Sequence, residues 1–133
     1  PLIRYRIGGR IVLAPKDKQC ACGSVFPIVN RIEGRSTDYI LSPTQGKINS
    51  ANISNSTKGI DGIIQFQVIQ EELDKVRVII VATETFDNKQ REKFKSALTD
   101  RFGTSMAIVM NVVDNIPKEK SGKFRVVKNN LKL

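Results

Sequence analysis

The feature that most constrains the fold is an alternating apolar segment in the middle of the chain. Over Gly62–Gln70 apolar and polar residues take turns, as they do in a strand with one buried face. A short polar turn over residues 71–74 leads into a second β-branched run, Lys75–Ala82. Because so short a connection joins antiparallel neighbours, we predict an antiparallel strand pair. The predicted inward face of the first strand consists of Ile64, Phe66 and Val68.

A helix with a defined start and stop follows this strand pair. Asp87 is a favoured N-cap residue, and Gln90 stands at the capping-box position three residues later. Gly103 is a typical stop signal, so the helix is predicted to run to about Phe102, before a strand over Thr104–Val113. The residues spaced for its inward face are Phe94, Ala97, Leu98, Arg101 and Phe102.

The rest of the chain gives weaker signals. Two short runs, Leu2–Ile7 and Arg10–Leu13, flank a Gly8-Gly9 pair that suits a hairpin turn. The other predicted elements are a strand over Ile28–Ile32, a short helix over Lys47–Ser54 and a basic tail from Asn115. The predicted fold class is α+β: a small antiparallel sheet with flanking helices, plus an N-terminal β-hairpin and a basic C-terminal tail.

The net charge of +9 is concentrated at the two ends of the chain. Residues 1–60 hold nine Lys or Arg against three Asp or Glu (+6), residues 61–116 hold seven against nine (−2), and residues 117–133 hold six against one (+5). Basic ends suit an anionic partner, either a nucleic acid or one small phosphorylated ligand. The chain has six Phe, two Tyr and no Trp, and most of these aromatic residues lie within apolar patterns rather than among the basic residues. A basic nucleic-acid-binding module stays open as an alternative, with nucleic acid the less favoured partner.

The sequence also excludes several kinds of chemistry. It contains no His, which removes Ser-His-Asp and Cys-His catalysis and the commonest metal ligand. It has no apolar run long enough to span a membrane. Two cysteines are too few for a disulfide scaffold. The sequence has no initiator Met and opens on Pro1 directly before a predicted strand, so we expect no signal or transit peptide and a piece cut from a longer, cytoplasmic protein.

Three short motifs carry groups suited to binding or catalysis. Lys123 follows Gly122 in a basic loop and could reach phosphate oxygens, although locally the segment also fits a solvated charge run. Arg35 follows a glycine and offers a planar fork for ribose, phosphate or carboxylate, or else a surface ion pair. Cys20 and Cys22 are half the ligand set of a tetrahedral zinc site, or else reduced structural thiols.

Five motifs, taken in order and spacing, resemble one family. They are Tyr5-Arg6-Ile7-Gly8, Cys20-x-Cys22-Gly23, Gly34-Arg35-Ser36-x-Asp38-Tyr39-Ile40, Ile64-Gln65-Phe66-Gln67-Val68-Ile69-Gln70 and Ile116-Pro117-x(3)-Ser121-Gly122-Lys123-Phe124-Arg125. Together they resemble the C-terminal domain of adenylate-forming enzymes of the acyl-CoA synthetase superfamily, of the phenylacetate–CoA ligase/CapK-like type associated with capsular polysaccharide biosynthesis. In such enzymes a carboxylic acid and ATP form an acyl-adenylate, and a thiol, usually that of coenzyme A, then takes the acyl group.

The resemblance implies roles for individual residues. Lys123 matches the lysine that bridges the acyl carboxylate and the ATP phosphates during adenylation. Arg35 matches the arginine that contacts the ribose hydroxyls. Thr37 holds the position of the hinge about which the small domain rotates, where Asp is usual, and Asp38 follows it and could share that role.

Two further motifs of the resemblance bear on nucleotide and metal binding. Tyr5 and Arg6 belong to a nucleotide-binding Tyr-Arg-x-Gly-Asp element, but Gly9 replaces the Asp that holds the ribose. This departure, with Thr37 at the hinge, keeps open a degenerate, non-catalytic ligase-like domain in a polysaccharide biosynthesis protein. Related sequences carry the Cys-x-Cys-Gly pair, which implies that Cys20 and Cys22 could form a zinc half-site completed by the large domain.

The resemblance also implies a domain organisation. Residues 1–34 correspond to the end of the large domain, with the β-hairpin and the Cys-x-Cys loop, residues 35–42 to the hinge, and residues 43–133 to the C-terminal lid. We expect the partner to be the chain's own missing N-terminal large domain. The ligands expected of the intact enzyme are ATP with Mg²⁺, a small-molecule carboxylic acid and CoA, and the isolated chain is expected to be inactive.

Overall fold

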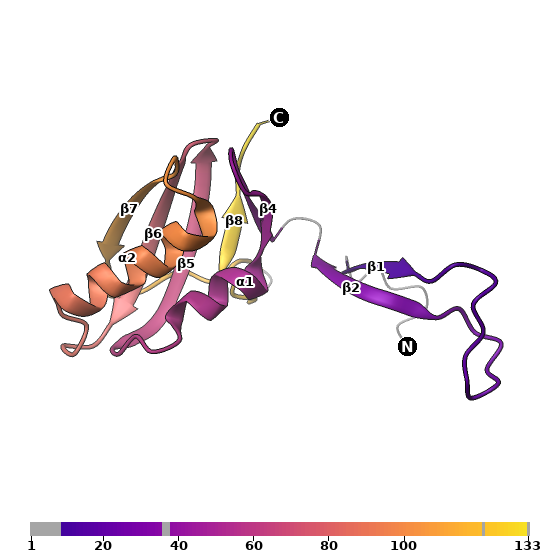
Figure 1. Cartoon of the computed structure of the whole chain (residues 1–133). Helices are drawn as coiled ribbons and strands as arrows, with labels where there is room; N and C mark the ends of the chain where they lie inside the picture. The colour runs from indigo at the N-terminus through magenta and orange to yellow at the C-terminus, as the bar shows by residue number, and fades with distance from the viewer. Residues whose placement is uncertain (1–8, 36–37, 121, 133) are drawn as a thin grey trace. The chain divides into compact units, whose positions relative to one another are not determined.

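The computed structural model describes residues 9–35, 38–120 and 122–132. The chain divides into two compact units, Pro1–Ser36 and Thr37–Leu133 (Figure 1). Among the described residues, no helix combines the length and the apolar character needed to cross a bilayer.

The N-terminal unit is built on a strand pair. β1 (Gly9–Leu13) and β2 (Val29–Arg35) pair antiparallel, and a long loop over residues 14–28 connects them. β2 includes most of the predicted strand and extends beyond it. In the predicted N-terminal hairpin, the first strand, Leu2–Ile7, lies outside the described residues, and the second strand corresponds to β1. The hairpin that the structure describes therefore joins β1 to β2 through the long loop.

A four-stranded sheet forms the centre of the C-terminal unit. Its strands are β7 (Ala107–Val112), β6 (Lys75–Ala82), β5 (Ile63–Glu72) and β8 (Val127–Asn129), in that order across the sheet. The predicted antiparallel pair, β5 with β6, is confirmed, but β6–β7 and β5–β8 are parallel. The α+β class is confirmed, and the sheet is mixed rather than antiparallel. β7 runs parallel to β6 because helix α2 (Asn88–Phe102) carries the chain back across the sheet between them (Figure 1).

The predicted inward face of β5 is wrong at its first residue. Phe66 and Val68 are buried as predicted, but Ile64 is 65% exposed. The pairing of β5 with β6 shifts between Ile63 and Gln65. Such a bulge changes which side chains point inward, so Ile63 packs against the core in place of Ile64.

The predicted helix corresponds closely to α2. The Asp87 side chain accepts a hydrogen bond from the backbone N–H of Gln90 at 2.8 Å, and the helix ends before Gly103, whose φ is +86°. The Gln90 side chain does not pair with the cap but accepts the N–H of Asp61 at 3.2 Å. Of the predicted inward face, Phe94, Leu98 and Phe102 are buried, while Ala97 and Arg101 are half-buried.

The hydrophobic core lies between α2 and the sheet. The ring of Phe94 on α2 meets that of Phe66 on β5 edge-to-face, with centroids 5.3 Å apart. The other core members come from α2, the small strands, the short helix, the four-stranded sheet and the segment before β7: Ile40, Ile48, Ile53, Val68, Val76, Val78, Ile80, Leu98, Phe102, Met106, Met110 and Val127.

A second, two-stranded sheet begins the C-terminal unit. β3 (Tyr39–Ser42) and β4 (Gly46–Asn49) pair antiparallel and lead into α1 (Ser50–Ser54) and the 3₁₀ turn η1 (Asn55–Thr57). The predicted helix over Lys47–Ser54 therefore starts three residues too early. Its first residues belong to β4, because the Asn49 side chain accepts the N–H of Asn52 at 2.9 Å and so caps the helix there.

The predicted C-terminal tail is partly wrong, because much of it belongs to the fold. Ile116 is only 2% exposed, and Val127 is fully buried in β8. Ile116 and Val127 therefore both contact the body of the unit, and the basic loop between these two residues is held at both ends.

Candidate active-site loop

The segment between Ile116 and β8 forms a tight turn that presents Lys123. The N–H of Glu119 donates to the carbonyl of Lys123 at 3.0 Å, and the N–H of Gly122 donates back to the carbonyl of Glu119 at 2.8 Å. Gly122 has φ of +74°, a left-handed conformation in which glycine is favoured. The Lys123 side chain is exposed. The glycine of the Gly-Lys pair thus allows a turn that leaves the ammonium group open to a ligand.

The far end of this loop is fixed along β5. The side-chain amide of Gln67 donates to the carbonyl of Arg125 at 2.6 Å, and the backbone N–H of Val68 donates to the carbonyl of Val126 at 2.7 Å. Gln67 is only 2% exposed, so its amide is held among packed neighbours. A buried amide with a defined partner fixes the backbone that follows Lys123 in one position.

Two carboxylates surround the side chain of Arg125. Its Nε lies 3.1 Å from Oε1 of Glu119 and 3.9 Å from Oδ1 of Asp38. The Asp38 side chain is 15% exposed, and the backbone carbonyl of the same residue accepts the N–H of Ser50 at 3.1 Å. Asp38 is therefore tied both to the loop with Lys123 and to the start of α1.

The predicted site residues are divided between the two units. Lys123 and Asp38 belong to the C-terminal unit. Arg125 connects the loop that carries Lys123 to the side chain of Asp38. Arg35 is the last residue of β2 in the N-terminal unit. Tyr5, Arg6 and Thr37 lie outside the described residues.

The predicted zinc half-site brings its two sulfurs together. Cys20 and Cys22 are free thiols whose Sγ atoms lie 2.8 Å apart, in a turn closed by a 2.9 Å hydrogen bond from the N–H of Gly23 to the carbonyl of Cys20. The neighbouring Cys20 thiol, with a smaller contribution from the backbone of Ser24, lowers the pKa of the Cys22 thiol. Across the described ranges, no group of three or more Cys, Asp or Glu side chains is placed to hold a metal ion. The pair supplies two of the four ligands that zinc needs.

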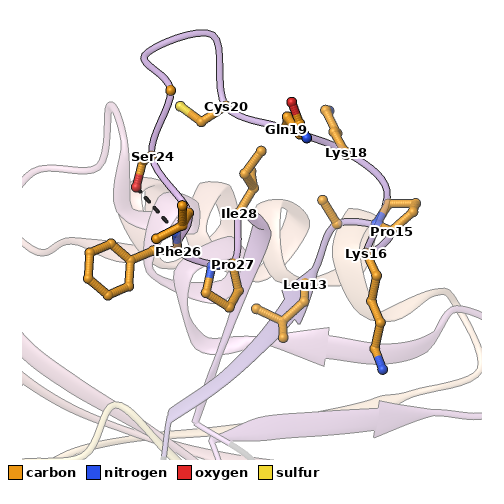
Figure 2. A pocket seen from close by; sticks show the side chains of 13 residues that line it. Leu13, Pro15, Lys16, Lys18, Gln19, Cys20, Ser24, Phe26, Pro27 and Ile28 are labelled. Carbon is orange, nitrogen blue, oxygen red and sulfur yellow. Dashed lines mark hydrogen bonds between the residues drawn. The ribbon is translucent and has the colours of Figure 1, made fainter.

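The same loop encloses a hollow of about 490 Å³. Figure 2 shows Leu13, Pro27 and Ile28 on one side of the hollow and Cys20 on the part of the loop that lies opposite them. Apolar side chains of this unit are also strongly exposed: Val25 is 95% and Phe26 79% exposed. A surface of this kind is typical of a segment that packs against another part of a protein.

A small α+β unit that presents a glycine-lysine loop from the edge of a mixed sheet defines the class of this protein. The model of the CapK C-terminal domain family matches residues 40–130, and the chain belongs to this family. Within that class, the chain is 29% identical over 142 residues to Protein CapK of Staphylococcus aureus, with 99% of this chain and 30% of that protein covered. The chain thus spans about a third of the length of this curated relative.

Solved structures share the fold. The match to 2-hydroxyisobutyryl-CoA ligase in the postadenylation state, in complex with R3-HIB-AMP, has a TM-score of 0.54 at 18% identity and covers 98% of this chain and 29% of the ligase. A second structure of that ligase, with 2-HIB-AMP and CoA in the thioesterification state, has a TM-score of 0.50 at 16% identity and covers 99% and 29%. The described fold is therefore shared with a region that makes up 29% of the 2-hydroxyisobutyryl-CoA ligase chain.

Sequence reasoning missed the parts that Arg125, Glu119 and Gln67 play in shaping the loop. Arg125 stands in the quoted motif, but nothing local in the sequence names its partners, Glu119 and Asp38. Gln67 offers a signal in retrospect, because a glutamine among large apolar residues in a strand is either exposed or paired. Here it is buried and holds the end of the loop.

Proposed function

We propose that this chain is the C-terminal part of an ATP-dependent ligase that forms an acyl-adenylate and then an acyl thioester. In the first step a carboxylate oxygen of the acid attacks the α-phosphorus of ATP, and pyrophosphate leaves. In the second step a thiolate, most simply that of CoA, attacks the acyl carbon, and AMP leaves. The observation that carries the proposal is the exposed Lys123 on its pinned turn, in a domain of this family and fold.

Lys123 has the properties that adenylation requires. An ammonium group is a compact point charge on a flexible stem, and it can contact the acyl carboxylate and the phosphate oxygens together. It stabilises negative charge that develops as pyrophosphate leaves, and loss of one such contact costs roughly 10²–10³ in rate. Mg²⁺ would neutralise further phosphate charge, and the described residues of this chain do not themselves form a metal site.

The other assignments complete the proposed site. Arg35 contacts the ribose hydroxyls, with Tyr5 and Arg6 also on the nucleotide. Thr37 and Asp38 form the hinge between a large domain that ends near residue 34 and the lid that begins near residue 43. The division of the chain after Ser36 is compatible with a hinge in this segment.

The chain is proposed to work together with an N-terminal large domain in a longer, cytoplasmic protein. The length of CapK, of which this chain matches 30%, supports a preceding domain, and so do the exposed apolar residues of the N-terminal unit. That domain would supply the acyl pocket and most of the nucleotide site. The isolated chain is therefore expected to form no acyl-adenylate, and turnover by this chain alone would contradict the proposal.

The test compares two exposed lysines of the same loop in the full-length protein. Lys123→Ala should lower carboxylate-dependent exchange of pyrophosphate into ATP roughly 10²–10³-fold. Lys120→Ala removes a similar charge from the same loop and should change the exchange less than about threefold, as for a solvated lysine. Thioester formation from preformed acyl-adenylate should be nearly unaffected in both variants. Equal losses in the two half-reactions, or no exchange in the unmodified protein with any carboxylic acid, would overturn the proposal, the latter in favour of a degenerate domain.

The cysteine pair carries a separate proposal. Cys20 and Cys22 would supply two thiolates to a zinc ion whose remaining ligands come from the large domain, because two ligands alone do not complete a tetrahedral site. Metal analysis of the full-length protein should find one zinc per chain, and Cys22→Ala should abolish it. A full-length protein purified without zinc, and unable to take it up, would contradict this assignment.

A further inference from the structure

The guanidinium of Arg125 lies where the loop with Lys123 meets the beginning of the C-terminal unit. Its Nε contacts the carboxylates of Glu119, at 3.1 Å, and Asp38, at 3.9 Å. The backbone of Glu119 in turn closes the turn through its bonds with Lys123 and Gly122. We propose that Arg125 is a positioning residue, which fixes the Lys123 loop to the segment through which the chain enters the C-terminal unit. This inference rests on the function proposed for Lys123.

The charges of this cluster are well placed to act on one another. The side chains of Asp38, Glu119 and Arg125 are 15%, 30% and 32% exposed, so solvent screens them less than it screens a fully exposed pair. Both carboxylates approach the same nitrogen and therefore lie close to each other. Loss of the cation would remove its attraction to both carboxylates and with it one connection between the loop and the Asp38 segment.

The backbone of Arg125 gives the side chain a fixed base. Its carbonyl accepts the amide of Gln67 at 2.6 Å, so the residue is anchored to the centre of the sheet. From this base the guanidinium reaches across the loop to Glu119, on the other side of the turn. A planar group with five donors in a fixed fork can hold two carboxylates at once, and the single ammonium of a lysine holds them with less directional control.

The consequence for catalysis is a loop whose position is set by the segment next to the proposed hinge. When the lid rotates, Lys123 moves with Asp38 as one body. Loss of Arg125 leaves the ammonium group present but displaced, and a displacement of about 1 Å can cost on the order of 10²-fold in rate. The loss should appear in kcat for adenylation, with little change in the KM for ATP, because the proposed contacts of Arg35, Tyr5 and Arg6 with the nucleotide are unchanged.

The first arm of the test needs no activity. Amide hydrogen exchange of the 133-residue chain, followed by NMR, reports the two hydrogen bonds of the turn at Glu119 and Gly122. Arg125→Ala should speed exchange at these two amides on the order of tenfold, in line with loss of a charge-assisted contact, and Arg125→Lys should have a smaller effect. The matched control is Arg77→Ala, which removes a 3.2 Å ion pair with Glu71 on the same unit and should leave both amides unchanged.

The second arm measures the two half-reactions in the full-length protein. Arg125→Ala should reduce pyrophosphate exchange about 10- to 100-fold and leave thioester formation from preformed adenylate within about threefold. Unchanged exchange at both turn amides would overturn the positioning role itself. Faster amide exchange without a selective loss of adenylation, while Lys123→Ala still abolishes it, would overturn the catalytic consequence. If Lys123→Ala itself has no effect on adenylation, the proposed function fails. A uniform loss in both half-reactions for Arg125→Ala would overturn the positioning role and leave Arg125 a structural one.

Discussion

A buried glutamine joins the two sheets of the C-terminal unit, and its replacement gives the sharpest test of the fold. Gln70 is fully buried at the end of β5. Its Oε1 accepts the backbone N–H of Leu41 on β3 at 2.8 Å, and its Nε2 donates to the carbonyl of the same residue at 2.7 Å and to that of Leu73 at 3.2 Å. The side-chain amide thus makes the two hydrogen bonds to the backbone of Leu41 that the backbone of a neighbouring strand would otherwise make.

Gln70→Leu keeps a similar volume and removes all three hydrogen bonds. Each buried backbone group left without its partner costs about 1–3 kcal/mol. Because Leu41 is only half-buried, water can reach part of its backbone, and the low end of that range applies to each group. We therefore expect a loss of about 2–4 kcal/mol, a large share of the ~5–15 kcal/mol of a typical domain.

Urea unfolding followed by circular dichroism measures this loss. With an m value of about 1–2 kcal/mol per molar, the midpoint should fall by roughly 1–4 M at unchanged m. A midpoint shift below about 0.5 M would refute the idea that the amide holds β3 in place.

Gln70→Glu separates hydrogen bonding from side-chain volume. The introduced carboxylate still accepts from Leu41 but faces two carbonyls where the amide had donated, so burial and these carbonyls raise its pKa in the folded state. A carboxyl whose pKa is raised by folding lowers the stability of the folded state, and this penalty is complete above the folded-state pKa. The penalty disappears as the pH falls below the pKa of the unfolded state, about 4.3. The stability gap to the wild-type chain should therefore narrow between pH 7 and pH 4. The gap for Gln70→Leu should stay constant, and parallel pH profiles for the two variants would contradict the assignment.

Three further predictions concern single positions. Asp87→Ala removes the cap of α2 and should lower stability by about 1 kcal/mol, seen as a lower urea midpoint. Gly103→Ala should lower the free energy of unfolding by more than about 1 kcal/mol, because φ is +86° and the new Cβ would collide with Oγ1 of Thr44. Adding Thr44→Ala should recover part of this stability, and full recovery would show that backbone strain contributes nothing. Cys20→Ala should shift the pH profile of Cys22 alkylation by iodoacetamide to higher pH, since the pKa of Cys22 is lowered chiefly by the Cys20 thiol, and an unshifted profile would contradict that cause.

The elements that the sequence predicts well are those whose signals are local. α2 is correct at both ends because its cap and its terminating glycine lie within a turn of the residues that they affect. The β5–β6 pair is correct because the turn between the strands is short. The predicted inward orientation of Ile64 is wrong because the alternating pattern assumes an unbroken strand register. The bulge beside Ile64 depends on pairing with β6, which the local sequence does not specify.

The elements that the sequence misses depend on distant partners. β8 is three residues long and lies in a basic stretch, and it becomes a strand only because β5 offers an open edge. The short strands β3 and β4 contain polar residues and are stabilised from outside, through Ile40 and Ile48 in the core. The same limit holds for the candidate site. Lys123 is visible in the sequence as part of a local Gly-Lys motif, whereas the partners of Arg125 come from the turn and from a position before β3.

β5 is the common support for the two segments that the Arg125 cluster joins. Its two buried glutamines are three residues apart, and Gln67 holds the carbonyl of Arg125 while Gln70 holds the backbone of Leu41, three residues after Asp38. A buried amide tolerates few arrangements, because any shift leaves a polar group without a partner. The strand therefore places the end of the lysine loop and the entry to the unit in one fixed relation, and the ion pairs of Arg125 close the connection from outside. Under the proposed function, rotation of the domain carries Lys123 into and out of the site, and this connection would preserve an alignment that a loop free to move on its own would lose.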